Sequence, residues 1–282
     1  EIGVLLNIQP DHLDRHGTMQ AYRELKSRLF NRMGPEDVGI VYESEFAAIR
    51  ALVKSDNRWV TFGQEPGADV RYAASHGVAY TDARGAQVSV SVSDTPFDNP
   101  VLGLAAAAAV AVAQAAGLEP VAVAEAMRRF SPLRHRMETV RVVAGVRFVD
   151  DSKATNLAAL KAGVEMSGSR IHLIAGGQLK EKQLKFVKEV LAMNVACVYV
   201  IGDAADMMML AWQDAVTCVI CVDLETAVGE AWKRATSGET VLLSPGCASF
   251  DQFKSYKDRG EQFKRIVEDI NEERRHEDII SG

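Results

Sequence analysis

The chain has 282 residues, of which 48% are hydrophobic and 25% are charged, ordinary proportions for a globular protein. This length is sufficient for two compact domains, each with its own core. The formal net charge of −6 gives no general attraction to nucleic acid or to an anionic membrane surface, so neither is expected as a partner.

The start of the chain shows no targeting or membrane segment. No apolar run approaches the roughly 20 residues that a membrane-spanning helix needs, and the first residues lack the basic region and cleavage pattern of a signal peptide. We therefore expect a cytoplasmic protein without membrane insertion. The chain begins without Met and almost directly in an apolar run, Ile2 to Ile8, which indicates an internal start point.

The N-terminal half is expected to begin with a strand and a loop, followed by a helix that starts near Thr18 and ends before Gly34. Thr18 is a suitable N-cap. An Ala-rich helix after Pro100 and a second helix at residues 121–130 close this half, and we place a domain boundary near Pro132. The short strands expected between these helices are residues 38–42, 58–63, 70–74, 77–82 and 87–92.

The second half begins with a hairpin at residues 139–151 and then alternates helices and strands. Such alternation predicts a doubly wound, mainly parallel sheet, in which ligands gather outside the carboxyl ends of the strands. Helices are expected from Asn156 and from Glu181, after residue 203, after residue 223 and after residue 246. The expected strands are residues 171–177, 197–203, 218–223 and 241–246.

The four cysteines are too few for a disulfide framework. Cys218 and Cys221 form a C-x-x-C pair inside an apolar strand, where positions i and i+3 point to opposite faces. We therefore expect neither a redox nor a metal role for this pair.

Lys26 occupies an unusual place on its helix, because the neighbouring apolar positions make it part of an apolar stripe. The members of this stripe stand at −4, +3, +4 and +7: Tyr22, Leu29, Phe30 and Met33. Burial would favour a neutral amine, which can act as a nucleophile, a base or a carbon dioxide acceptor that forms a carbamate. The alternative is a lysine that snorkels at the stripe's edge. His12, in the preceding acidic loop, either ligates a metal or caps the loop.

Two further runs place polar residues at expected strand ends. Asp150–Asn156 opens a helix, and Lys153 with the backbone N–H groups there suits a phosphate or carboxylate. Plain capping by Thr155 is the alternative. In the run 244–253, Ser249 either donates to a substrate carboxylate or is an ordinary helix cap. The Gly176-Gly177 turn with Lys180 is a weaker signal.

Taken together, these segments resemble the Mur ligase family, and within it the branch that adds D-glutamate to UDP-N-acetylmuramoyl-L-alanine. The runs DDSKATN and LSPGCASFDQFKSYKDRG are similar to this branch's C-terminal motifs, whereas the D-N-P-R motif of the diamino-acid-adding branch is absent. The family signature N-x-x-x-D-H-x-D followed by Y-x-x-x-K is matched by Asn7, Asp11, His12, Asp14, Tyr22 and Lys26.

The resemblance implies an α/β fold of two parts. Residues 1–132 would be the C-terminal part of a P-loop-type central ATP-binding domain, and residues 133–282 a Rossmann-like amino-acid-binding domain. The implied cofactors are ATP and Mg²⁺, and the implied reaction is amide ligation through an acyl phosphate. The implied partners are small molecules, namely UDP-N-acetylmuramoyl-L-alanine, D-glutamate and ATP, bound by a monomer.

The same resemblance implies roles for individual residues. His12 would ligate magnesium together with a carbamylated Lys26, and Lys153 would contact phosphate. The nucleotide would be bound by Arg136, Asp151 and Asn99. D-glutamate would be held by Thr155, Lys180, Ser249 and Tyr256.

The chain also departs from the family pattern. It has no G-x-x-x-x-G-K-S/T loop, so we expect no ligation by this chain unaided. Leu102 stands where an asparagine is usual, Tyr256 where Phe is frequent, and Gln178-Leu179 where an acidic or glycine-containing pair is usual. The rival interpretations are a related amide ligase such as a folylpolyglutamate synthetase, and a binding module without turnover.

Overall fold

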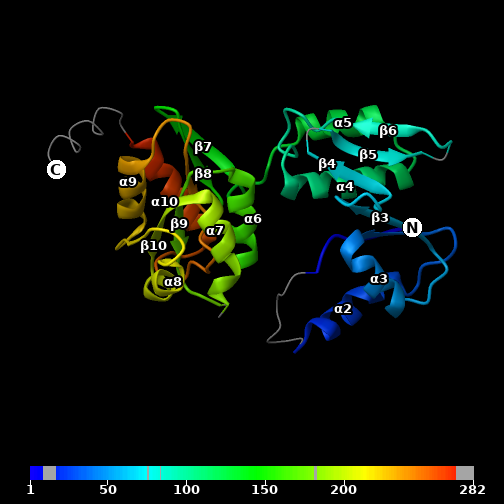
Figure 1. Ribbon diagram of the computed structural model, residues 1–282, viewed down its shortest axis with the longest axis horizontal. Helices are drawn as coiled ribbons and strands as arrows, with labels where there is room; N and C mark the ends of the chain where they lie inside the picture. Colours follow the sequence, from blue (N-terminus) through cyan, green and yellow to red (C-terminus); the bar gives the residue numbers. More distant parts are fainter. Residues whose placement is uncertain (9–16, 75, 83, 181–182, 271–282) are drawn as a thin grey trace. The chain divides into compact units, whose positions relative to one another are not determined.

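The computed structural model describes residues 1–8, 17–74, 76–82, 84–180 and 183–270. The chain separates into two compact units, Glu1–Ser131 and Pro132–Gly282. Each has its own sheet and its own core, so each is described by itself (Figure 1).

The N-terminal unit is built on a six-stranded sheet whose strands follow the chain order. The first four strands are parallel, and the last three form an antiparallel meander. The strands are β1 (Ile2–Leu5), β2 (Val38–Tyr42), β3 (Arg58–Gly63), β4 (Val70–Ala73), β5 (Gly77–Thr81) and β6 (Gln87–Val90). All five short strands predicted from the sequence are therefore confirmed.

Helices cover both faces of this sheet, because alternate strand residues such as Ile40 and Val41 enter two different cores. One core contains α4 (Pro100–Ala115) and α5 (Pro120–Arg129), and the other contains η1 (Arg28–Phe30) and α3 (Glu43–Leu52), with α2 (Met19–Ser27) packed against it. Thr18 caps α2 as predicted, since its Oγ1 accepts a hydrogen bond from the Ala21 N–H at 3.1 Å. Helix α3 was not predicted.

Of the two interpretations of Lys26, burial in the apolar stripe is wrong, because its side chain is exposed, as expected for a lysine at the stripe's edge. Helix α2 ends at Ser27 and the chain continues as the 3₁₀ turn η1, so buried positions recur every third residue, at Ser27, Phe30 and Met33. This tighter winding turns Leu29 outward, to 50% exposure. The Lys26 ammonium lies 5.2 Å from the ring centre of Tyr22.

The C-terminal unit is built on a six-stranded sheet in the order β11-β10-β9-β12-β8-β7. Five strands are parallel, and only the edge strand β7 is antiparallel, as the partner of β8 in a hairpin. The strands are β7 (Glu138–Val143), β8 (Val146–Asp150), β9 (Ile171–Gly176), β10 (Val195–Ile201), β11 (Cys218–Ile220) and β12 (Thr240–Leu243). The predicted hairpin and doubly wound, mainly parallel sheet are confirmed.

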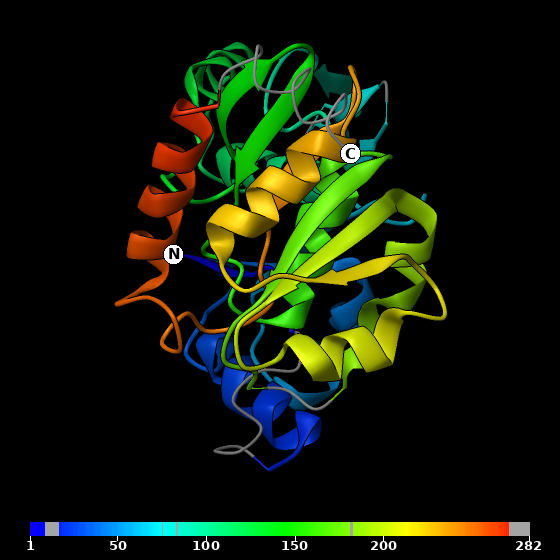
Figure 2. The same ribbon diagram turned by 90° about the vertical axis from the view of Figure 1, so that its left-hand side faces the viewer.

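Helices lie on both faces of this second sheet. One core contains α6 (Leu157–Ser167), α7 (Lys188–Asn194) and α8 (Ala205–Trp212), and the other contains α9 (Leu224–Arg234) and α10 (Tyr256–Glu268). Figure 2 shows the two helices of the second core, α9 in gold and α10 in red. Among the described residues, no helix has both the length and the apolar character that crossing a membrane requires.

Two helix starts differ from the sequence predictions. The helix expected from Glu181 begins at Lys188, after the 3₁₀ turn η2 (Leu184–Val187). The helix expected close after β12 begins only at Tyr256, where Ser255 is the N-cap and accepts from the Asp258 N–H. A loop of twelve residues therefore joins β12 to α10, and this loop contains Ser249.

Cys218 and Cys221 lie on opposite faces of the sheet, as their spacing predicts. All four are free thiols. Cys218 packs against the core on the α6 side of the sheet, whereas Cys221 is buried in the core on the α9 side.

Candidate functional site

The carboxyl ends of four parallel strands lie side by side in the C-terminal unit, because β12 pairs with both β8 and β9, and β9 pairs with β10. Small or polar residues stand at these ends: Asp150-Asp151 after β8, Gly176-Gly177 after β9, Gly202 after β10 and Ser244 after β12. In doubly wound sheets this edge is where ligands bind.

Asp151 and Ser244 join the ends of the neighbouring strands β8 and β12. Ser244 is fully buried, and its hydroxyl donates to Asp151 Oδ2 at 2.8 Å. The Met137 N–H donates to Asp151 Oδ1 at 3.3 Å. Helix α6 passes close by with Gly163, where a Cβ would lie 2.7 Å from Asp151 Oδ2. The absence of a side chain at Gly163 therefore leaves room for the carboxylate.

Burial raises the pKa of Asp151 to about 7, and the neighbouring charge of Asp150 acts in the same direction. The hydrogen bonds from Ser244 and Met137 and the charge of Arg136 oppose the shift. Close to neutral pH this carboxyl therefore changes between a charged acceptor and a neutral group.

The raised pKa predicts how stability depends on pH. Because the folded pKa exceeds the unfolded value of 3.8, the stabilisation from this group is complete below that value and is lost as pH rises through about 7. Asp151→Asn cannot ionise, so its unfolding free energy relative to wild type should increase by about 3 kcal/mol between pH 5 and pH 8. Denaturant unfolding at both pH values measures this difference. Equal differences at both pH values would contradict the prediction, and the exposed Asp203→Asn is the control.

Lys153 and Tyr256 meet above this edge. The Lys153 ammonium lies 4.1 Å from the centre of the Tyr256 ring, a close cation–π contact. The loop beneath them is tied to α10, since the Ser152 hydroxyl donates to the Tyr256 carbonyl at 2.8 Å. Two residues predicted for phosphate and for D-glutamate are therefore neighbours, although about 100 residues separate them in the chain.

Sequence reasoning missed Arg259, the largest buried polar side chain near this edge. Its guanidinium donates to the Ser152 hydroxyl and carbonyl, both at 2.9 Å, and to the Cys247 carbonyl at 3.1 Å. It therefore joins the loops after β8 and β12. Its NH1 is buried and has no hydrogen-bond partner within the part of the chain that the structure describes. Burial lowers the pKa of Arg259 to about 10.

The remaining predicted residues of this unit lie around the same edge. Ser249 is buried one residue beyond Ala248, which forms a two-way backbone bridge with Gln178. The bridge brings the Ser249 loop beside the turn that leads to the exposed Lys180. Arg136 is exposed, and Thr155 is half-buried next to Asn156, which caps α6 through the Ala159 N–H.

Two predicted site residues of the N-terminal unit, His12 and Asn99, are not placed in a binding site by the described structure. His12 lies outside the described residues. Asn99 is the N-cap of α4: its side chain accepts from the N–H groups of Val101 and Leu102 and donates to the Pro96 carbonyl. Its polar atoms are therefore engaged locally, and Leu102 follows within the first turn of the helix.

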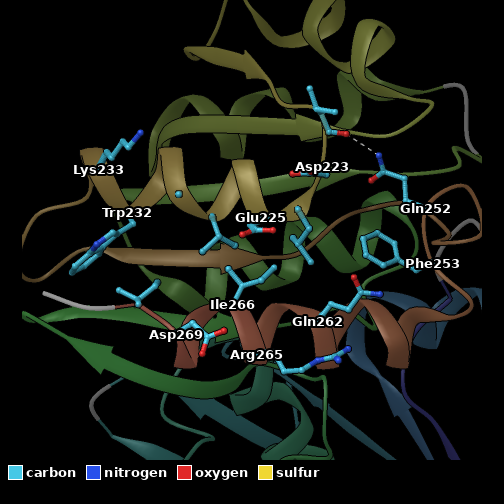
Figure 3. Close-up of a pocket in the computed structure, with 15 residues that line it drawn as sticks. Asp223, Glu225, Trp232, Lys233, Gln252, Phe253, Gln262, Arg265, Ile266 and Asp269 are labelled. Carbon is cyan, nitrogen blue, oxygen red and sulfur yellow. Dashed lines mark hydrogen bonds between the residues drawn. The ribbon is translucent and has the colours of Figure 1, made fainter. Parts of the chain in front are cut away.

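A groove of about 1050 Å³ lies between α9 and α10 in the C-terminal unit (Figure 3). Trp232, Phe253 and Ile266 contribute apolar surface to it, and Lys233 and Arg265 add basic groups. At one end the Gln252 amide donates to the Val222 carbonyl at 2.9 Å. None of the predicted site residues lines this groove, so its volume alone does not mark the site.

Two α/β units in series, the second with polar residues gathered at its strand ends, define a ligand-binding protein of the doubly wound α/β class. The profile described as Mur ligase middle domain matches residues 1–117, and the one described as Mur ligase, glutamate ligase domain matches residues 135–247. The chain belongs to the Mur ligase family.

Curated relatives of this chain are named UDP-N-acetylmuramoylalanine--D-glutamate ligase. The proteins from Desulfotalea psychrophila and Acidobacterium capsulatum are each 36% identical over 94% of this chain. The chain spans 58% of the length of these relatives.

Solved structures share the fold. MurF from Acinetobacter baumannii superposes with a TM-score of 0.68 at 16% identity, covering 94% of this chain and 59% of that one. FolC from E. coli, in complex with DHPP and ADP, gives 0.65 at 20% identity, covering 94% and 61%. A Yersinia pestis folylpolyglutamate synthase/dihydrofolate synthase complexed with AMPPNP and Mn ion gives 0.61 at 17%, covering 89% and 59%.

Proposed function

We propose that the protein containing this chain is an ATP-dependent ligase that adds D-glutamate to UDP-N-acetylmuramoyl-L-alanine in peptidoglycan synthesis. The observation that carries the proposal is the meeting of the DDSKATN and SPGCASFDQF runs at one sheet edge. There Ser244 donates to Asp151, and Arg259 bonds both loops. The names of the relatives at 36% identity support the substrate pair.

The proposed reaction has two transfers. The carboxylate of the acceptor attacks the γ-phosphate of ATP, and ADP leaves with the electron pair of the broken P–O bond. The amine of D-glutamate then attacks the acyl phosphate, loses a proton, and phosphate leaves from the tetrahedral intermediate. Negative charge grows on phosphate oxygens in both steps, so a fixed cation beside them lowers both barriers.

The residues of the sheet edge are assigned on this scheme. Lys153 supplies the fixed cation, and the Tyr256 ring below its ammonium restricts where that ammonium points. Asp151 and Arg136 bind the nucleotide. Thr155, Lys180, Ser249 and Tyr256 hold D-glutamate, whose two carboxylates suit a lysine and hydroxyl donors.

Magnesium would neutralise phosphate charge in such a ligase, but the described residues do not assemble the predicted site for it. His12 lies outside them, and the burial that made Lys26 a candidate for carbamylation is not observed. The roles of His12, Lys26 and Asn99 stay predictions from the family resemblance.

Two rival functions remain to be separated by experiment. The folylpolyglutamate synthase neighbours share only the fold with this chain, at 20% identity or less, whereas the curated relatives with higher identity are D-glutamate ligases. A binding module without turnover is the second rival. Phosphate release by the full-length gene product, with and without D-glutamate and the UDP-linked acceptor, decides between them. Release that needs both substrates supports the proposal. The absence of phosphate release when both are present contradicts it.

The role of Ser249 predicts a selective effect on substrate affinity. Ser249→Ala removes one donor to a substrate carboxylate, so the KM for D-glutamate should rise about ten-fold. The KM for ATP should change much less. Steady-state kinetics with each substrate varied in turn measure both constants, and equal increases would remove Ser249 from the D-glutamate site. Ser237→Ala, an exposed serine just before β12, is the control.

A further inference from the structure

A buried histidine joins the segment that follows the unit boundary to the end of β8. We call residues 132–137 the connecting segment. His135 Nδ1 lies 2.7 Å from Asp150 Oδ2, close enough for the ring N–H to donate to the carboxylate. Both side chains are buried. Gly260 on α10 packs against this pair, and a Cβ there would lie 2.3 Å from His135 Nδ1 and 2.7 Å from Asp150 Oδ2.

The backbone of the connecting segment is bound to the same loop. The Lys153 N–H donates to the His135 carbonyl at 3.1 Å. The Met137 N–H donates to Asp151 Oδ1, as described above. The other oxygen of Asp150 accepts from the Ser152 N–H at 2.9 Å. The residues on both sides of Arg136 are therefore tied to the loop that carries Asp151 and Lys153.

Arg136 itself stands between two residues in a left-handed conformation. His135 has φ 63° and Met137 has φ 49°. Residues with a Cβ adopt this region only when their surroundings hold them there. The hydrogen bonds to Asp150 and Asp151 are among the contacts that hold these two residues, together with the bond from the His135 backbone N–H to Glu138.

A metal site is the alternative explanation of this cluster. His135, Glu138 and Asp150 offer ligand atoms within 4.8 Å of one another. However, the Lys264 ammonium already donates to both oxygens of Glu138, at 2.9 and 2.8 Å. The backbone N–H of His135 donates to Glu138 as well. Lys264 therefore supplies the positive charge beside Glu138, whereas Asp150 accepts from the Ser152 N–H and lies within hydrogen-bond distance of His135. These contacts fit a structural latch.

We infer that the His135–Asp150 pair is a latch that positions Arg136 for the nucleotide beside Asp151 and Lys153. Both members are positioning residues, since they act through the connecting segment. The inference rests on the proposed function, because it takes Arg136 as a nucleotide-binding residue. It adds that the affinity for ATP depends on a side-chain contact that does not itself touch the ligand.

Two substitutions at residue 135 separate the latch from the backbone. His135→Gly accepts the left-handed conformation but removes the donor. His135→Asn also tolerates that conformation, and its amide can still donate to Asp150. In the full-length gene product the glycine variant should raise the KM for ATP about ten-fold, with a smaller change in kcat. The asparagine variant should restore most of the affinity.

Arg134→Gln is the matched control, because it removes a neighbouring exposed cation that pairs with the half-buried Glu261 and makes no hydrogen bond to Asp150 or Asp151 among the described residues. It should leave both constants unchanged. The double variant Arg136→Ala with His135→Gly should bind ATP no worse than Arg136→Ala alone, since the latch acts through Arg136. Additive effects, or a wild-type KM in His135→Gly, would overturn the inference.

A readout without turnover keeps this test separate from the proposed function. In the isolated chain, His135→Gly should reduce the protection of the Met137 and Lys153 amides against hydrogen exchange, while His135→Asn and Arg134→Gln keep it. Unchanged protection in the glycine variant overturns the latch even if the ligase activity is found. If His135→Gly does not fold, Asp150→Asn replaces it, with a smaller loss of protection expected at the same amides.

Discussion

Arg259→Met is expected to lower the unfolding free energy of the C-terminal unit by about 3 kcal/mol. The substitution removes the three hydrogen bonds that Arg259 donates to the Ser152 hydroxyl and to the carbonyls of Ser152 and Cys247. Removal of a buried charge that forms no ion pair among the described residues offsets part of this cost. The melting temperature should fall by roughly 10 °C, because each kcal/mol shifts a unit of this size by a few degrees.

The control for this prediction lies on the same helix. Arg265→Met has the same change in side-chain size and helix propensity, but Arg265 is exposed, so calorimetry should show a shift of about 1 °C or less. Equal melting temperatures for the two variants would show that the hydrogen bonds of Arg259 contribute no net stability. Hydrogen exchange at β8 and β12 would locate the loss, since Arg259 bonds the loops after both strands.

Lys153→Met should lower kcat for D-glutamate-dependent phosphate release by about 10² to 10³. The reason is that a fixed cation at the phosphate stabilises charge that grows only in the transition state, so its removal affects kcat more than KM. The variant should fold normally, because Lys153 is only half-buried and its ammonium contacts the face of Tyr256.

Lys161→Met is the matched control on the next helix. Lys161 pairs with Glu165 one turn further along α6, and such a pair contributes little to stability. Its kcat should equal that of wild type. If Lys153→Met also turned over at the wild-type rate, Lys153 would be removed from the chemistry, and the anion expected at this helix start would need another partner.

Much of the fold follows from local patterns. Strands of four to seven residues with alternating or continuous apolar side chains, such as Val38–Tyr42 and Val195–Ile201, were predicted within a few residues of their observed bounds. Some helix starts with a side-chain cap were also predicted, as at Thr18 and Asn156, whereas the start of α10 after Ser255 was not. Helix α3 was missed because it follows β2 without an intervening turn or side-chain cap.

Burial inferred from the spacing of apolar residues on a helix failed for Lys26 and would have succeeded for Arg259. A 3.6-residue spacing left Lys26 either buried or at the stripe's edge, and it is exposed where its helix changes to a 3₁₀ turn two residues later. Arg259 stands four and eight residues before Phe263 and Val267 on α10, which continues regularly to Glu268. The apolar spacing around a basic residue therefore indicated its burial only where the α-helix continued without a change to 3₁₀ winding.

The sequence by itself determined the two α/β units, the parallel sheet and the runs at its strand ends, because these depend on periodicity and turn chemistry within short stretches of chain. Only the tertiary structure decided which polar side chains are buried and how they pair. Asp151, Ser244 and Arg259 come from distant parts of the chain, and the hydrogen bonds that join them across the two loops form only when β12 lies beside β8. Burial without water makes those bonds necessary, and no local pattern contains that information.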